Sequence, residues 1–306
     1  MSTEFLHGTG VAIVTPFRED NSIDFLSMGK VVEHLIKGNV EYIVALGTTG
    51  ESVTLSADEK AAVISFVIEA VNGRVPVVMG IGGNNTHEVQ QSVKAVCREN
   101  LPLAAVLSVS PYYNKPNQEG LYHHYSKISS SCTLPLILYN VPGRTGGNIT
   151  AETTVRLAHD FRNIVAIKEA SGNLNQINHI IKDKPKDFLV ISGDDQLTLP
   201  MISLGASGVI SVSANAFPRE LSEMVRLALK GNFRKAQQIQ NALLDIMDTH
   251  FAEGNPAGVK GSLSIMKLID NNLRLPLCPL SKPTFTKLEA LIRELDKIKE
   301  KLPLGE

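Results

Sequence analysis

The sequence contains no tryptophan, only three cysteines and no excess of charge of either sign. Its 30 Lys and Arg residues are balanced by 31 Asp and Glu residues, so the formal net charge is -1. This balance argues against a general nucleic-acid binder, because such proteins carry a basic excess or a basic stripe. We therefore expect small-molecule partners, recognised by a few placed charges, with no nucleic acid and no membrane.

The cysteines and the apolar segments exclude further classes of protein. Cys97, Cys132 and Cys278 are odd in number and lack a CxxC spacing, so they indicate neither a disulfide framework nor a cysteine metal site. Free cysteines are typical of a reducing compartment. The N-terminus lacks the basic start and apolar run of a signal peptide, and the longest apolar stretches are shorter than the ~20 residues of a membrane span. We expect a cytoplasmic protein.

The chain has instead a repeated alternation of short apolar runs and amphipathic segments. Eight runs are bounded by Gly, Pro or Asn, which is typical of strands buried on both faces of a parallel sheet. These runs are Gly10–Val14, Tyr42–Leu46, Val75–Gly80, Ala104–Val109, Leu136–Tyr139, Ile164–Lys168, Phe188–Ser192 and Gly208–Val212. Helical patterns separate them, and one of these begins with the capping-box pair Ser56 and Glu59.

This order of elements predicts an α/β fold, a (β/α)8 TIM barrel with a C-terminal helical extension. A doubly wound open sheet is the main alternative, but the turn Thr15-Pro16-Phe17 after the first run lacks its G-x-G-x-x-G fingerprint. The strand pattern stops near Glu220, and helical patterns follow. We expect a catalytic barrel over residues 1–220 and a helical region over residues 221–306.

Unusual residues gather where the expected strands end, which is the active edge of such a barrel. Lys168 ends an otherwise apolar run, and a confined neutral amine there is the nucleophile of Schiff-base chemistry. A solvated lysine, or one paired with Glu169, is an equally good interpretation of this pattern. Thr48 and Thr49 lie between glycines and offer hydroxyls for a carboxylate, although an ordinary turn has the same pattern.

Tyr139 and Arg144 lie at the next candidate strand end. Tyr139 suits a proton relay if hydroxyls connect it to the reacting carbon, although an aromatic strand end is commoner. Arg144 lies in a loop with Pro and Gly, where it could hold a carboxylate through two hydrogen bonds or be solvated. The eight histidines show no ligand spacing such as H-E-x-x-H, so no metal site is expected.

Five motifs together resemble those of the dihydrodipicolinate synthase/N-acetylneuraminate lyase family of class I aldolases. They are Gly47–Glu51, Tyr112-Tyr113-Asn114, Tyr139–Gly146, Ile167–Ala170 and Gly193-Asp194-Asp195, in the family's order. The Tyr139–Gly146 segment is similar to the YNVPxRTG motif of the dihydrodipicolinate synthase branch. The resemblance implies a lysine-dependent barrel enzyme that forms a homotetramer, a dimer of dimers.

The resemblance also implies the catalytic roles. Lys168 would form a Schiff base with pyruvate, which requires no external cofactor, and Thr49 would bind the pyruvate carboxylate. Tyr139, Thr48 and Tyr113 would relay protons, with Tyr113 reaching in from a neighbouring subunit.

The second substrate follows from the same resemblance. Arg144 would hold the carboxylate of L-aspartate 4-semialdehyde, and the Ile210 carbonyl would lie near the lysine, with Gly193 and Asp194 as further substrate-binding candidates. The implied reaction produces 4-hydroxy-tetrahydrodipicolinate for diaminopimelate and lysine biosynthesis. Another pyruvate-dependent aldolase, such as N-acetylneuraminate lyase or a keto-deoxy sugar-acid aldolase, is the alternative, followed by a non-catalytic binding barrel.

The sequence departs from the lysine-inhibited members of the family just after Gly47–Glu51. Those members carry histidines where this chain has Ala57 and Lys60. Because a cation at Lys60 would repel a bound lysine, we expect weak or absent feedback inhibition by L-lysine. The segment Glu253–Lys260 is less proline-rich than in the family and indicates nothing about substrate. The residues that correspond to the allosteric site are Ser52, Lys60, Asn84, Glu88 and Tyr112.

Overall fold

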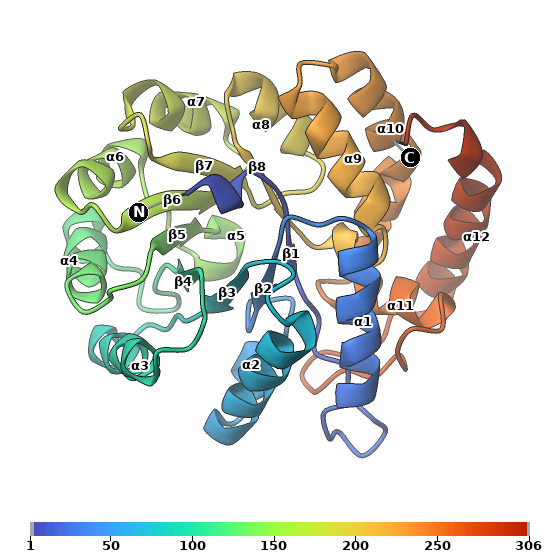
Figure 1. The fold of residues 1–306 in the computed structure, drawn as a ribbon, viewed down its shortest axis with the longest axis horizontal. Coiled ribbons are helices and arrows are strands. Elements are labelled where there is room, and N and C mark those ends of the chain that lie inside the picture. Colours follow the sequence, from blue (N-terminus) through green and yellow to red (C-terminus); the bar gives the residue numbers. More distant parts are fainter. Residues whose placement is uncertain (1–2, 305–306) are drawn as a thin grey trace.

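The computed structural model describes residues 3–304 and contains eight parallel strands that close into a barrel (Figure 1). The strands follow one another around the barrel in chain order, and β8 pairs with β1. They are β1 (Gly8–Ala12), β2 (Tyr42–Ala45), β3 (Val77–Gly80), β4 (Ala105–Val109), β5 (Leu136–Asn140), β6 (Ile164–Glu169), β7 (Leu189–Ser192) and β8 (Gly208–Ser211). The expected TIM barrel is confirmed, with small shifts at the strand ends.

Helices alternate with the strands and form the outer ring (Figure 1). Those up to β8 are α1 (Phe25–Lys37), α2 (Ala57–Val71), α3 (Thr86–Glu99), α4 (Gln118–Ser129), α5 (Pro142–Thr145), α6 (Ala151–Asp160), α7 (Leu174–Asp183) and α8 (Thr198–Leu204). Short 3-10 helices are η1 (Glu4–Leu6), η2 (Ser52–Thr54), η3 (Ser213–Asn215) and η4 (Lys299–Lys301). The capping box of Ser56 and Glu59 is confirmed at the start of α2. Within residues 3–304, no helix is long and apolar enough to cross a membrane.

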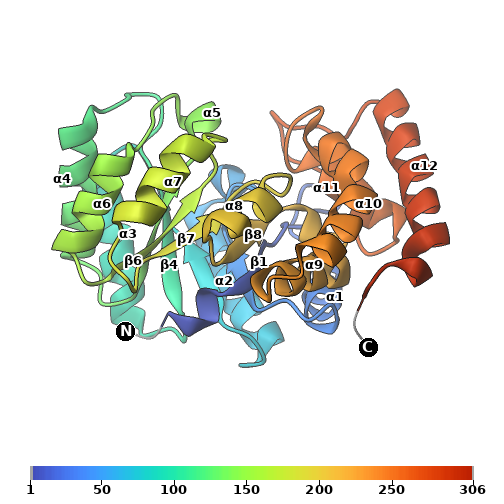
Figure 2. The same cartoon turned by 90° about the horizontal axis from the view of Figure 1, so that it is seen from above.

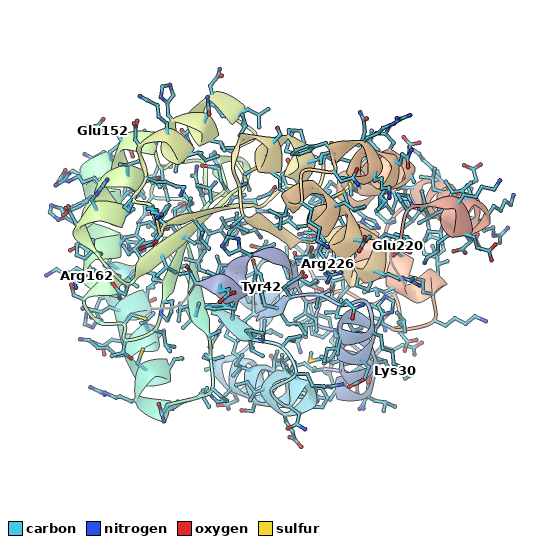
Figure 3. The ribbon with its side chains drawn as sticks, turned by 45° about the horizontal axis from the view of Figure 1, so that its top comes forward. Lys30, Tyr42, Glu152, Arg162, Glu220 and Arg226 are labelled. Atoms are coloured by element: carbon cyan, nitrogen blue, oxygen red, sulfur yellow. The ribbon has the colours of Figure 1, made fainter. Side chains whose placement is uncertain are left out.

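The barrel interior is filled by apolar side chains. Tyr42, Ile137 and Ile210 are fully buried there, and Leu6 of η1 packs against the same cluster. Tyr42 lies near the centre of the molecule in Figure 3, whereas Glu152 of α6 lies toward its edge. A filled interior leaves the strand ends as the place for chemistry, as is general for this fold.

Within the described residues, four α-helices follow β8 and lie together at one side of the barrel (Figures 1 and 2). They are α9 (Pro218–Leu229), α10 (Phe233–Phe251), α11 (Ala257–Ile265) and α12 (Lys282–Ile298). Helix α9 packs on β1, and α12 packs on α10 and α11. At Gly258 a Cβ atom would lie 2.3 Å from the Cα of His250, so glycine permits the close approach of α11 to α10. The expected division after residue 220 falls inside α9 and stays a prediction.

Candidate active site

A cavity of about 490 Å³ lies at the carboxyl ends of the strands. Its lining comes from several strand ends and from α2 and α5, because parallel strands bring their carboxyl ends to one edge of the barrel. Eight of the expected site residues meet there. They are Thr48, Thr49, Ser52, Lys60, Tyr112, Tyr139, Arg144 and Lys168.

Lys168 is the fifth residue of the six-residue strand β6 and is only 5% exposed. Its neighbour across the sheet is Tyr139, and Lys168 Nζ lies 4.4 Å from the centre of the tyrosine ring. Glycine at position 193 makes room for the lysine, since a Cβ there would lie 3.0 Å from Lys168 Cε. The adjacent Glu169 is engaged elsewhere, accepting hydrogen bonds from Asn140 Nδ2 at 3.1 Å. Lys168 is therefore a buried amine on the cavity wall.

The turn after β2 places Thr48 and Thr49 on the cavity wall. Leu46 and Glu51 flank this turn with φ values of 59° and 52°, in the left-handed region. Non-glycine residues adopt this conformation at a cost in free energy, and such strain is concentrated at functional sites. Gly80 permits the arrangement, because a Cβ at this position would lie 2.4 Å from the Leu46 carbonyl oxygen. Packing around the turn therefore imposes its conformation.

Residues of the C-terminal helical region hold this turn from outside the cavity. Asn255 Nδ2 donates a hydrogen bond of 2.9 Å to Thr49 Oγ1. Lys260 of α11 forms an ion pair with Glu51, and both side chains are fully buried. Burial lowers the pKa of Lys260 to about 8, although the Glu51 carboxylate opposes this shift. The pattern of Glu253–Lys260 did not point to these contacts, and its one available signal was a lysine among small and apolar residues.

The remaining catalytic and substrate candidates lie outside the cavity lining. Tyr113 has a φ of 72° and is 89% exposed. Asp194 Oδ1 accepts hydrogen bonds from two backbone N–H groups just before α8, at 3.0 and 3.3 Å. Burial raises the pKa of Asp194, and the neighbouring carboxylate of Asp195 raises it further. Ile210 is buried among the apolar residues of the barrel interior. Gly193 is placed to accommodate Lys168.

The residues matched to the allosteric site divide into two groups. Ser52, Lys60 and Tyr112 line the cavity. Asn84 and Glu88 are instead engaged in the loop and helix beside it. Asn84 Nδ2 donates to the Tyr112 carbonyl at 3.2 Å. The Glu88 carboxylate accepts a hydrogen bond of 2.9 Å from Asn85 Nδ2, the N-cap side chain of α3. The Asn84 side chain thus supports the loop that carries Tyr112.

Two histidines are buried within the protein framework. His124 Nδ1 lies 2.9 Å from the Thr86 hydroxyl, and His250 lies between the hydroxyls of Ser213 and Ser262 at 2.9 and 2.8 Å. Burial lowers their pKa values to about 4 for His124 and about 3 for His250. Within residues 3–304, no group of three or more His, Cys, Asp and Glu side chains could hold a metal ion.

Known proteins share the sequence and the fold over nearly their whole length. Residues 6–295 match the Dihydrodipicolinate synthetase family. The 4-hydroxy-tetrahydrodipicolinate synthase of Parabacteroides distasonis is 51% identical over 290 residues, which is 95% of this chain and 97% of that protein. The structure of the 4-hydroxy-tetrahydrodipicolinate synthase of Methylacidiphilum fumariolicum SolV has a TM-score of 0.93 and 40% identity, over 97% of this chain and 98% of that one. A dihydrodipicolinate synthase of Acinetobacter baumannii, crystallised with pyruvate, has a TM-score of 0.91 and 42% identity, over 95% and 99% of the two chains. The chain therefore belongs to the dihydrodipicolinate synthetase family.

Proposed function

We propose that the chain condenses pyruvate with L-aspartate 4-semialdehyde to 4-hydroxy-tetrahydrodipicolinate, as a lyase of diaminopimelate and lysine biosynthesis. Its relatives at about half identity bear the name of this synthase, and one similar structure holds pyruvate. The observation that carries the proposal is the buried amine of Lys168 beside Tyr139, on the wall of the cavity. The reaction takes place in the cytoplasm, a location supported by three free cysteines.

In this mechanism Lys168 supplies the nucleophile. Its amine adds to the carbonyl carbon of pyruvate and water leaves, so that a C=N bond replaces the C=O bond. The hydroxyl oxygen of Tyr139 accepts a proton from the pyruvate methyl group while its own hydrogen passes to the Thr48 hydroxyl. The electron pair of the broken C–H bond moves toward the C=N nitrogen, which produces an enamine. The nitrogen lone pair then drives attack of the enamine carbon on the aldehyde, which restores the C=N bond. The amino group of aspartate semialdehyde displaces the Lys168 amine from this bond as the product ring closes. The reaction therefore needs no external cofactor.

The hydroxyl and guanidinium groups of the site handle protons and carboxylates. The aldehyde oxygen becomes an alkoxide as the C–C bond forms, and Tyr139 returns the proton through a route that includes Thr48 and Tyr113 of a neighbouring subunit. Thr49 binds the pyruvate carboxylate, and Arg144 holds that of the aldehyde by charge-assisted hydrogen bonds. Fixing both substrates makes the addition effectively unimolecular, which lowers its entropic barrier.

The subunit arrangement is a homotetramer, a dimer of dimers, in which Tyr113 completes a neighbour's site. Tyr113 is 89% exposed and Val53 is 82% exposed, and the cavity-lining Tyr112 is 37% exposed. Grouped exposed apolar side chains mark protein interfaces. Mixing Tyr113→Phe and Lys168→Ala chains should restore activity, since a mixed dimer has one site with both residues intact. No recovery after subunit exchange would contradict this arrangement.

Borohydride reduction in the presence of pyruvate tests the proposed chemistry. Two lysines line the cavity, Lys60 and Lys168, so peptide mass mapping has an internal control. We expect the reduced adduct at Lys168 and none at Lys60. Absence of an adduct at Lys168 would refute the aldolase mechanism. Initial rates with aspartate semialdehyde should then exceed those with N-acetylmannosamine, which tests the aldehyde.

A further inference from the structure

We propose that Asn255 is a positioning residue for pyruvate, because its amide fixes the Thr49 hydroxyl as a donor to the pyruvate carboxylate. The inference rests on the proposed function, in which Thr49 binds that carboxylate. Asn255 is 6% exposed, lies in the C-terminal region just before α11, and does not line the cavity. It therefore acts on the substrate through Thr49.

The direction of one hydrogen bond carries the inference. Asn255 Nδ2 donates to Thr49 Oγ1 at 2.9 Å. A hydroxyl has a single hydrogen, so when its oxygen accepts from an amide its own hydrogen must point elsewhere. Thr49 lines the cavity, and within residues 3–304 its side chain has the Asn255 amide as its one hydrogen-bond partner. The hydroxyl hydrogen thus remains free for a carboxylate, which only accepts.

The other end of the amide makes no competing contact. Asn255 Oδ1 is buried and has no donor in the part of the chain that the structure describes. Among the described residues, the one side-chain hydrogen bond of Asn255 is therefore the one that its Nδ2 donates to Thr49.

A second attachment fixes the turn relative to Asn255. Lys260 of α11 pairs with Glu51, two residues beyond Thr49. Helix α11 is anchored in turn on α10, where His250 Nε2 lies 2.8 Å from the Ser262 hydroxyl. Since the C-terminal region holds the turn at two points, the amide meets the hydroxyl in a defined orientation.

Asn255→Asp distinguishes positioning from a merely structural contribution. A carboxylate has nearly the same shape but only accepts, so the Thr49 hydrogen turns toward it and away from pyruvate. We expect the KM for pyruvate to rise about tenfold or more, with the KM for the aldehyde unchanged. Burial raises the pKa of the introduced carboxyl group, so on acidification it takes up a proton and donates again. The ratio of variant to wild-type KM should therefore fall on acidification, and a constant ratio would overturn the inference.

Asn272→Ala is the matched control for loosening of the C-terminal region. Asn272 Nδ2 donates to the Phe17 carbonyl at 3.2 Å and does not contact Thr49. This variant and Asn255→Ala should lower the unfolding temperature similarly, but only Asn255→Ala should raise the KM for pyruvate. An equal rise in both variants would show that the effect is structural.

Two further measurements cover failure of the variant and failure of the mechanism. If Asn255→Asp does not fold, Asn255→Ala replaces it. This change should raise the KM for pyruvate in the wild-type protein but not in Thr49→Val, which has no hydroxyl to position. An equal rise in both backgrounds would overturn the inference. Borohydride trapping at Lys168 measures pyruvate half-saturation without the aldehyde. A wild-type protein without an adduct refutes the proposed function, whereas a normal adduct with unchanged half-saturation in Asn255→Asp refutes only the role of Asn255.

Discussion

The buried pair of Lys260 and Glu51 leads to a stability prediction in which the two partners are not equivalent. Both side chains are fully buried, and Lys260 Nζ also donates to the Asn272 carbonyl at 2.9 Å and lies 4.3 Å from the centre of the Phe17 ring. Lys260→Met retains an unbranched chain but leaves the Glu51 carboxylate buried, with a backbone N–H from Arg274 at 3.1 Å. Removing one partner of such a pair costs about 3–5 kcal/mol. We expect this loss in the free energy of unfolding.

Glu51→Gln should cost less at about pH 8, because Lys260 can lose its charge. Burial lowers the pKa of Lys260 to about 8 with Glu51 present. Without that carboxylate the pKa falls further, so the folded variant holds a neutral amine. At about pH 8 the folded wild type has itself lost about half of this proton, so complete deprotonation in the variant adds almost nothing to the loss in free energy of unfolding. Lost hydrogen bonds account for about 1–2 kcal/mol.

The sign of the pH dependence follows from the same protonation states. Below about pH 8, Lys260 of the wild type is charged in both the folded and the unfolded chain, so this group has little effect on the slope. In Glu51→Gln the folded amine is neutral while the unfolded amine is charged. The variant should therefore lose a further ~1.4 kcal/mol per unit of acidification relative to wild type, between about pH 8 and about pH 6.

Urea denaturation at a fixed protein concentration measures these differences. The matched control is the double variant Glu51→Gln with Lys260→Met, which should be more stable than Lys260→Met because no charge remains buried. Equal losses for the two single variants at about pH 8, or a pH-independent gap between Glu51→Gln and wild type, would refute the reasoning.

The site and one buried histidine offer further tests. Tyr139→Phe should lower kcat by about 10²- to 10⁴-fold while borohydride still traps pyruvate, and full activity would exclude the relay. Arg144→Ala should raise the KM for aspartate semialdehyde about 10- to 100-fold in initial-rate measurements, whereas a change confined to pyruvate would contradict its role. L-Lysine should inhibit weakly or not at all in an activity titration, and Lys60→His should increase the inhibition; micromolar inhibition of the wild type would refute this expectation. Burial lowers the pKa of His250 to about 3, so the unfolded chain binds a proton below about pH 6.5 that the folded chain excludes. Stability should thus fall by about 2 kcal/mol from pH 7 to pH 5 through this residue, and urea denaturation should show a smaller fall in His250→Gln.

The sequence by itself determined the elements of the fold, because the signals for them are local. Short apolar runs bounded by Gly, Pro or Asn are strands in the structure, and the capping pair Ser56 and Glu59 begins α2. Lys168 stood out because a cation at the end of such a run is unusual. The order of the motifs then placed their residues at one edge of a barrel. The cavity contains Lys168, Tyr139 and Arg144, as that order predicts.

Only the tertiary structure decided which distant groups meet. Thr49 and Asn255 are 206 positions apart yet share a hydrogen bond, and Lys260 pairs with Glu51 in the same contact region. No periodicity marks these residues, because each looks ordinary within its own segment. Strand and helix patterns depend on neighbours a few positions away, whereas a buried polar pair depends on two surfaces meeting. The packing of the C-terminal helices against the barrel decides that meeting.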